Sequence, residues 1–143
     1  MKNALKQKKF SALLLVVLII SVHAYSQDWP LFLGPECNST SPQENLLRSW
    51  PESGPDVLWS ADLVIGYGGP VVKDGNIYLL DRDNAVGDKM RCFDLNTGKE
   101  LWKFEYDAAG EVMFPGSRSV PIVDDKHVYS TGPYGDLYCI DIK

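Results

Sequence analysis

Residues 92–102 read Cys-Phe-Asp-Leu-Asn-Thr-Gly-Lys-Glu-Leu-Trp, and the chain begins the same pattern again at residues 139–143, Cys-Ile-Asp-Ile-Lys. The segments before the two copies also match: residues 70–78 read Pro-Val-Val-Lys-Asp-Gly-Asn-Ile-Tyr, and residues 121–129 read Pro-Ile-Val-Asp-Asp-Lys-His-Val-Tyr. The two prolines are 51 residues apart and the two cysteines are 47 apart. A period of this length, built from short strand-like runs, is typical of repeat proteins.

Short runs rich in β-branched and aromatic residues alternate with turn residues in each copy. In the first copy these runs cover residues 57–59, 69–73, 76–80, 90–94 and 100–105. We expect each run to form a strand. Asp-Gly at 74–75 and Asn-Thr-Gly at 96–98 supply tight turns, with 124–125 and 135–136 as their counterparts in the second copy. No segment outside residues 1–26 has a helical period. The sequence therefore predicts an all-β fold.

A single four-stranded sheet cannot bury both of its faces, whereas a closed ring of about four to eight such sheets can. We therefore expect a β-propeller of four-stranded antiparallel blades that begins at residue 57, with repeats at about 66–106 and 117–143. Only about one and a half to two blades are present. Two copies cannot close a ring, so we expect the amino-terminal fragment of a longer protein or, alternatively, an assembly of several chains.

The repeated pattern resembles the tryptophan-docking motif of the PQQ-like, or quinoprotein-type, β-propeller family, Ala-x-Asp-x-x-Thr-Gly-Lys-x-x-Trp. Cys92 stands at the small first position. The matching residues are Asp94, Thr97, Gly98, Lys99 and Trp102, and the second copy begins with Cys139 and Asp141. The resemblance implies that Asp, Thr and Gly hold the turn by hydrogen bonds, while the Trp packs onto the neighbouring blade.

Two further segments resemble exported members of this family. Residues 29–35 read Trp-Pro-Leu-Phe-Leu-Gly-Pro, similar to an opening Trp-Pro-x-Phe-Arg-Gly-Pro, and residues 116–121 resemble a strand start Gly-x-Arg-x-Thr-Pro. Leu33 departs from the Arg of the first pattern and Val120 from the Thr of the second.

Residues 1–26 have the composition of a secretory signal peptide. Four lysines precede a largely apolar run at 10–22, and Ala-Tyr-Ser at 24–26 places small residues at a cleavage site. The run of 13 residues is shorter than the roughly 20 that span a membrane, although an uncleaved anchor is the alternative. We expect cleavage, a periplasmic or secreted protein without a membrane span, and an irregular lead segment at 27–56.

Charge and cysteine content limit the partners. Without residues 1–26, the remaining 117 residues carry 10 Lys and Arg against 19 Asp and Glu, a formal charge of −9. The basic residues are scattered, so nucleic acid is not expected as a partner.

The chain has three cysteines, Cys37, Cys92 and Cys139, and an odd number leaves at least one unpaired. We expect Cys92 and Cys139 to be small buried residues, with a disulfide between them as the alternative.

Arg118 is the candidate ligand-facing and cofactor-binding residue. It lies between Gly116 and Ser119 at the start of a strand, and propeller strands begin near the central channel. Its paired N–H donors suit a carboxylate or a quinone oxygen, while a clamp on its own loop is the alternative. Tyr67 holds the position of the first copy that matches Arg118, and we expect it to pack against other side chains.

Residues 81–88 resemble the start of a calcium loop. They lack the Gly of its sixth position, and its acidic twelfth ligand is replaced by Cys92. We therefore expect a polar insertion in a hairpin and no metal site.

One propeller fold hosts many functions. We expect a non-catalytic exported scaffold whose face loops bind protein partners, or whose central channel holds a small-molecule ligand. The alternative is a PQQ-dependent dehydrogenase that oxidises an alcohol or a sugar. The chain shows no catalytic motif and no adjacent cysteine pair. No cofactor is therefore evident here, and PQQ with calcium stays open for a longer protein.

Overall fold

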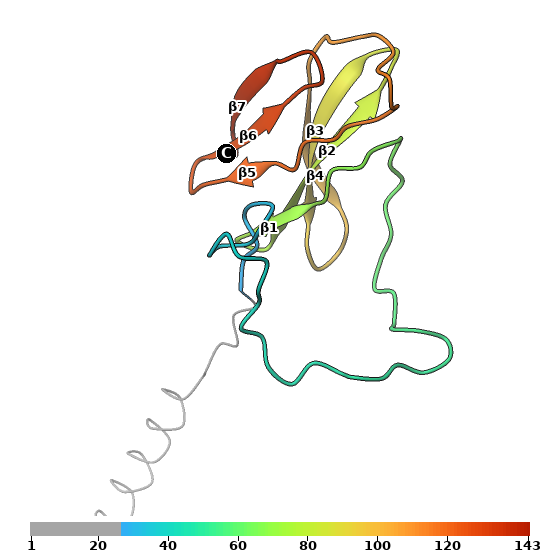
Figure 1. Cartoon of the computed structure of the whole chain (residues 1–143), viewed down its shortest axis with the longest axis vertical. Coiled ribbons are helices and arrows are strands. Elements are labelled where there is room, and N and C mark those ends of the chain that lie inside the picture. The colour runs from blue at the N-terminus through green and yellow to red at the C-terminus, as the bar shows by residue number, and fades with distance from the viewer. Residues whose placement is uncertain (1–26) are drawn as a thin grey trace, which may run out of the picture.

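Two antiparallel sheets are the core of the structure, a computed structural model that describes residues 27–143 (Figure 1). The first sheet has the order β1-β2-β3-β4 and the second β5-β6-β7. The strands are β1 (Val71–Lys73), β2 (Asn76–Asp83), β3 (Gly87–Asp94), β4 (Glu100–Glu105), β5 (Ile122–Val123), β6 (His127–Thr131) and β7 (Leu137–Asp141). No helix occurs at 27–143, so the all-β prediction is confirmed. The predicted signal peptide lies outside the described residues.

The predicted turns explain the register of the first sheet. Asp74 and Gly75 have φ values of 50° and 75°, which is the backbone of a tight two-residue hairpin. The turn pairs Val71 with Tyr78 across β1 and β2. Residues 96–98 join β3 to β4 as expected.

Two strand predictions are wrong. Residues 57–59 form no strand, because no neighbouring strand pairs with them. Residues 81–88 form the end of the β2–β3 hairpin as expected, but the predicted strands at 76–80 and 90–94 are too short, since β2 and β3 continue to Asp83 and from Gly87. Arg82 pairs with Asp88 in this extension, and both side chains are completely buried. Their mutual neutralisation allows a polar sequence to form buried strands.

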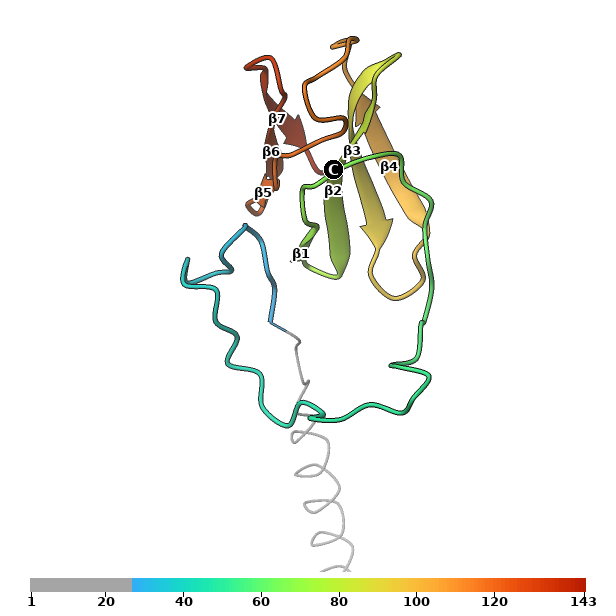
Figure 2. The same ribbon diagram turned by 45° about the vertical axis from the view of Figure 1, so that its right-hand side comes forward.

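The two sheets pack face to face, as Figure 2 shows. One cross-strand row of the first sheet contains Val71, Tyr78, Cys92 and Trp102. This row packs against a row of the second sheet, Val123, Val128 and Ile140. The half-buried indole of Trp102 lies 6.0 Å from the Tyr78 ring, measured between centroids. Burial of these apolar side chains is the main stabilising contribution to the sheet pair.

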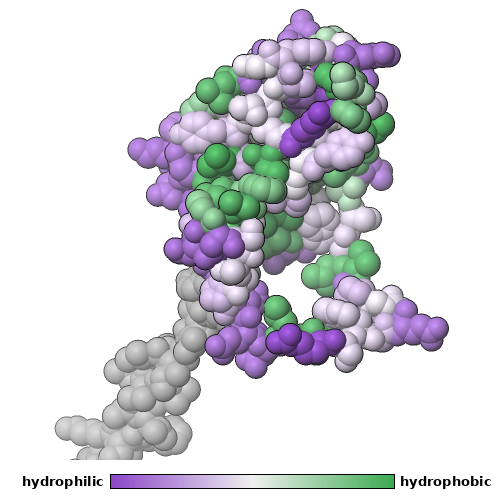
Figure 3. Space-filling view, viewed as in Figure 1, coloured by the Kyte–Doolittle hydropathy of each residue, from purple (hydrophilic) through white to green (hydrophobic). Residues whose placement is uncertain are grey.

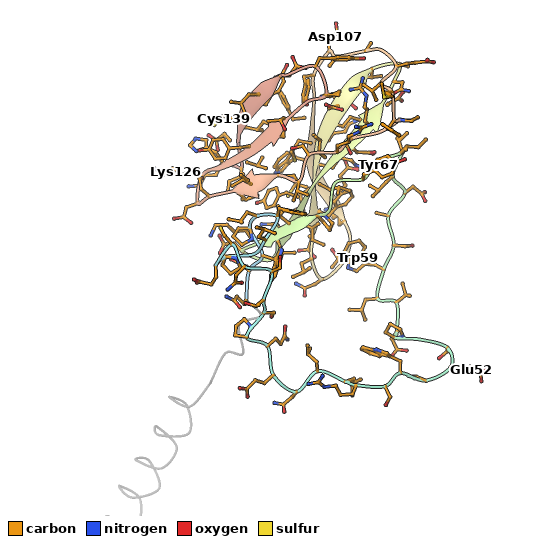
Figure 4. The ribbon with its side chains drawn as sticks, viewed as in Figure 1. Glu52, Trp59, Tyr67, Asp107, Lys126 and Cys139 are labelled. Atoms are coloured by element: carbon orange, nitrogen blue, oxygen red, sulfur yellow. The ribbon has the colours of Figure 1, made fainter. Side chains whose placement is uncertain are left out.

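The two equivalent cysteines differ in exposure. Cys92 is buried between the sheets as expected, whereas Cys139 is exposed and the prediction for it is wrong. Cys139 belongs to the row of the second sheet that faces away from the first (Figure 4). Alternate residues of a strand point to opposite faces, so the same repeat position is covered in one copy and open in the other. All three cysteines are free.

The lead segment is anchored at its start. Trp29 exchanges backbone hydrogen bonds of 2.8 and 3.0 Å with Val72, and the carbonyl of Pro30 accepts one of 2.9 Å from the Val123 N–H. It thus crosses the free edges of β1 and β5, and Figure 3 shows apolar surface over this crossing. Residues 40–53 then run away from the sheets and are exposed (Figure 1).

Candidate functional site

The loops that precede the two repeats lie side by side. Gly66 and Ser117 form a parallel bridge, and the Tyr67 N–H donates to the Ser117 carbonyl at 2.6 Å. A Cβ at Gly116 would lie 2.8 Å from the backbone nitrogen of Gly66, so this approach of the two loops requires glycine at 116. The contact brings together Tyr67 and Arg118, which hold equivalent positions in the two copies.

Tyr67, Phe114 and Arg118 line an open recess of about 490 Å³. Tyr67 is 69% exposed and Phe114 is 54% exposed. The guanidinium carbon of Arg118 lies 4.7 Å from the centroid of the Phe114 ring, and Nη2 donates to the Phe114 carbonyl at 3.1 Å. Nε and Nη1 donate to no other residue at 27–143. The recess therefore offers two aromatic surfaces beside a positive charge with free donors.

Arg118 lines this recess, and its contacts are compatible with both interpretations of the sequence. One nitrogen clamps its own loop while two remain available to a ligand. The expectation that Tyr67 packs is wrong, because no element covers its loop. Phe114 was missed. The available signal was an aromatic residue followed by Pro-Gly just before Arg118, which places it in an exposed turn.

A second recess, of about 440 Å³, lies against β4, but its charges pair with each other. Arg91 Nη2 lies 2.7 Å from Glu100 Oε2 and Nη1 lies 3.2 Å from Asp81 Oδ2. The hydrogen bond to Glu100, followed by the contacts with Asp81, raises the pKa of Arg91. These side chains are already satisfied, so we place the candidate site at the recess of Tyr67, Phe114 and Arg118.

A buried ionic cluster, which the sequence did not reveal, fixes the chain that leads into this recess. Arg82 Nη1 lies 2.9 Å from Asp88 Oδ1, and Arg82 Nη2 donates to the carbonyls of Ala108 and Gly110 at 2.9 Å each. The Tyr106 hydroxyl donates to Asp88 Oδ2 at 2.8 Å. Burial is the main cause that raises the pKa of the Tyr106 hydroxyl, and the hydrogen bond to Asp88 is the second cause. The cluster attaches the β4–β5 connection to the first sheet.

Asp94 organises the turn of the repeated motif. Its Oδ1 accepts hydrogen bonds from the Asn96 N–H at 3.1 Å and from the N–H and hydroxyl of Thr97 at 2.8 and 2.7 Å. The Thr97 hydroxyl is the main cause that lowers the pKa of Asp94. Gly98 has a φ of 69° and donates to the Asp94 carbonyl at 2.9 Å. The Lys99 N–H donates to the Thr97 hydroxyl at 3.3 Å.

The indole that lies on this turn belongs to Trp59. Its Nε1 donates to the Leu95 carbonyl at 2.9 Å, and a Cβ at Gly98 would lie 2.5 Å from its ring. Figure 4 shows Trp59 near the turn that joins β3 to β4. In the second copy, Asp141 Oδ1 accepts a hydrogen bond from the Lys143 N–H at 3.0 Å. This bond is equivalent to the one from the Asn96 N–H to Asp94 Oδ1 in the first copy.

Comparisons with protein-family models, with curated proteins and with solved structures found no match. At residues 27–143, no three His, Cys, Asp or Glu side chains gather in a way that could hold a metal ion. In the same range, no helix is long and apolar enough to cross a membrane.

Proposed function

We propose that this chain is an exported PQQ-like β-propeller protein that acts as a non-catalytic binding scaffold, with the recess of Tyr67, Phe114 and Arg118 as a contact site for a protein partner. The observation that supports this proposal most directly is the Arg118 guanidinium, which lies on the exposed Phe114 ring in a recess that the exposed Tyr67 also lines, with donors that bond to no other residue at 27–143. Aromatic and arginine side chains contribute most of the binding energy in many protein interfaces. Met113, 91% exposed, adds apolar surface next to Phe114.

The propeller part of the proposal is supported by the repeated geometry. Equivalent strands form two stacked antiparallel sheets, and the loops before β1 and β5 lie together. In a ring of such sheets, loops at the same end of successive sheets would share one face. A partner that binds this face contacts equivalent positions of neighbouring repeats, as Tyr67 and Arg118 are here.

The chemistry of the recess selects a partner segment that carries a carboxylate beside an apolar side chain. The carboxylate would accept two N–H bonds from Arg118, and the apolar group would lie against the rings of Tyr67 and Phe114. The excess of acidic residues elsewhere on the chain repels acidic segments, so a positive recess directs them to this site.

N-acetyl-L-phenylalanine is a suitable probe because it joins a ring to a carboxylate, and its carboxamide is the matched control. Titration followed by NMR should shift the signals of Tyr67, Phe114 and Arg118, with the acid binding at least about fivefold more tightly than the amide. Arg118→Gln should abolish this preference. Equal binding of the two compounds, or shifts confined to other parts of the chain, would refute the recess as the contact site.

A PQQ-dependent dehydrogenase is the second candidate, and the same recess favours it. PQQ is a planar quinone with carboxylates, which suits aromatic surfaces beside a guanidinium. Residues 27–143 gather no three-ligand group for the calcium ion, so the fit is limited to Arg118 and the two rings. The test is reduction of a dye by an alcohol or a sugar after addition of PQQ and Ca²⁺. Turnover that depends on both PQQ and Ca²⁺ would refute the scaffold proposal in favour of the dehydrogenase.

A further inference from the structure

One asparagine of the sequence is followed, two positions later, by serine or threonine. Residues 38–40 read Asn-Ser-Thr, which is the acceptor pattern for N-linked glycans in exported proteins. The asparagines at positions 3, 45, 76, 84 and 96 do not have this pattern. The pattern is short and occurs by chance in many proteins. The structure around Asn38 therefore decides whether the site is suited to modification.

The carboxamide of Asn38 is held by Thr40. Asn38 Oδ1 accepts hydrogen bonds from the Thr40 N–H at 2.9 Å and from the Thr40 hydroxyl at 2.7 Å. A backbone N–H can only donate, so the atom that faces it is the carboxamide oxygen and not the nitrogen. Asn38 Nδ2 donates to no other residue at 27–143, and the whole side chain is exposed. The nitrogen that receives a glycan in such sites is therefore free.

The backbone around Asn38 forms an ordered turn that fits the acceptor pattern. Ser39 has a φ of 59°. Proline cannot adopt this value, because its ring fixes φ near about −65°. The turn therefore excludes proline at the middle position, as the acceptor pattern does. On either side of Asn38, the Cys37 N–H donates to the Gly34 carbonyl at 2.9 Å and the Ser39 N–H donates to the Leu33 carbonyl at 2.8 Å.

The turn is attached to the first sheet through Trp29. A Cβ at Gly34 would lie 2.7 Å from the Trp29 ring, so the turn packs closely on the indole. The backbone of Trp29 pairs in turn with Val72 of β1. Asn38 thus belongs to the folded part of the lead segment, and the folded chain is the acceptor to be tested.

We propose that Asn38 is a glycosylation site, which accepts an oligosaccharide from a lipid-linked phosphate donor once the chain has been exported. Nδ2 forms a bond to the anomeric carbon of the sugar, and the bond from that carbon to the phosphate oxygen breaks. The electron pair of the broken bond stays with the phosphate, which also takes up the proton that Nδ2 loses. The N–H and hydroxyl of Thr40 stabilise the charge that builds up on Oδ1 as this proton leaves.

The surroundings of Asn38 also suit an enzyme that transfers glycans. Glu36 is exposed and places a carboxylate two positions before Asn38, which gives a transferase with a basic peptide groove a second point of recognition. The same turn exposes Phe32 by 69% and Leu33 by 36%. A glycan is bulky and solubilising, so it would shield these apolar side chains. The proposal involves no residue of the recess and stands apart from the function assigned to it.

Transfer of a glycan to the folded full chain tests the proposal. The chain is incubated with a purified oligosaccharyl transferase and a lipid-linked oligosaccharide of known mass, and the product is analysed by intact-mass spectrometry and peptide mapping. We expect one glycan per chain, on the peptide that contains Asn38. A synthetic peptide of residues 34–42 is the positive control, since it shows that the transferase is active.

Substitutions of Thr40 separate its hydroxyl from its shape. Thr40→Val keeps the shape and removes the hydroxyl bond to Asn38, so transfer should slow at least about tenfold, as expected for a lost hydrogen bond to a group that gains charge. Thr40→Ser keeps the hydroxyl and should stay within about threefold of the unsubstituted chain. Asn38→Gln should accept no glycan. Circular dichroism checks that each variant is folded.

Three results would overturn the proposal. The first is a peptide that is glycosylated while the folded chain is not, because the native turn would then not be an acceptor. The second is transfer to Thr40→Val at the same rate as to the unsubstituted chain. The third is a glycan that maps to a residue other than Asn38.

Discussion

The indole N–H of Trp59 donates a 2.9 Å hydrogen bond to the carbonyl of Leu95, 36 residues further along the chain. The contact attaches the end of the lead segment to the turn of the repeated motif. The ring lies 2.5 Å from the position that a Cβ at Gly98 would take, so the glycine provides both the positive φ of the turn and the surface for the indole. The repeated motif is therefore a docking surface as well as a turn.

Loss of this contact should destabilise the protein. Trp59→Ala removes a half-buried ring and its hydrogen bond, so the free energy of unfolding should fall by about 2 kcal/mol, less than for a fully buried Trp. Urea denaturation at a fixed protein concentration measures the change. The matched control is Trp50→Ala, since Trp50 is 56% exposed and should change the stability by less than about 0.5 kcal/mol. Equal losses in the two variants would contradict the docking role.

The buried pair of Arg82 and Asp88 should be far more sensitive to substitution than an exposed pair. Asp88→Asn leaves the buried Arg82 guanidinium without its counter-charge, so we expect a loss of about 3 kcal/mol in the free energy of unfolding. Glu105→Gln is the control, because Glu105 pairs with Lys103 at the surface and the change should stay below about 1 kcal/mol. If Asp88→Asn were as mild as the control, the cluster would not fix the loop.

Acid should weaken the β5–β6 turn. Asp124 Oδ1 accepts from the N–H groups of Lys126 and His127 at 2.7 Å each, and these bonds lower its pKa from 3.8 to about 2. A carboxylate with a lowered folded pKa stabilises the protein above its unfolded pKa, and this stabilisation is lost as the pH falls from about 4 to about 2. Asp124→Asn should show a smaller fall in Tm over this range than the unsubstituted chain. Asp107→Asn, at an exposed position, should show the same fall as the unsubstituted chain.

Alkali should act on the core through Cys92. Burial raises the pKa of its thiol from 9.0 to about 11. An acid with a raised folded pKa stabilises the protein below the unfolded pKa, and the stabilisation is lost as the pH rises from about 9 to about 11. Tm measured across this range should fall less in Cys92→Ala than in Cys37→Ala, whose side chain is exposed. The interpretation fails if both variants lose Tm equally.

Export of the chain is a separate prediction. When the full sequence is produced in a bacterium with a general secretion pathway, cleavage after Ser26 should give a periplasmic product that begins at Gln27. Amino-terminal sequencing of the fractionated protein measures this. An intact product that starts at Met1 in the membrane fraction would instead support the uncleaved anchor.

The sequence predicted what local chemistry decides. The turns at 74–75 and 96–98 and the existence of β1, β2, β3 and β4 depend on neighbouring residues, so they could be identified without coordinates. The recess could not be predicted from the sequence. It joins Tyr67 to Phe114 across 47 positions of sequence, and backbone contacts such as the bridge between Gly66 and Ser117 bring the two loops together.

Polar composition concealed how far β2 and β3 extend into residues 81–88. Charged residues usually indicate a loop, but Arg82 and Asp88 neutralise each other across a strand pair and stay buried. The exposure of Cys139 was misjudged for a different reason. The repeat fixes which face a residue occupies, while burial depends on whether a further sheet covers that face.

The central claim is that the two copies of the repeat form successive sheets packed face to face, and a nuclear Overhauser experiment on methyl and aromatic groups tests it most directly. The structure predicts cross-peaks between Val71 or Tyr78 of the first sheet and Val123 or Val128 of the second, because these side chains share one core cluster. Cross-peaks confined to each sheet, with none between these pairs, would contradict it.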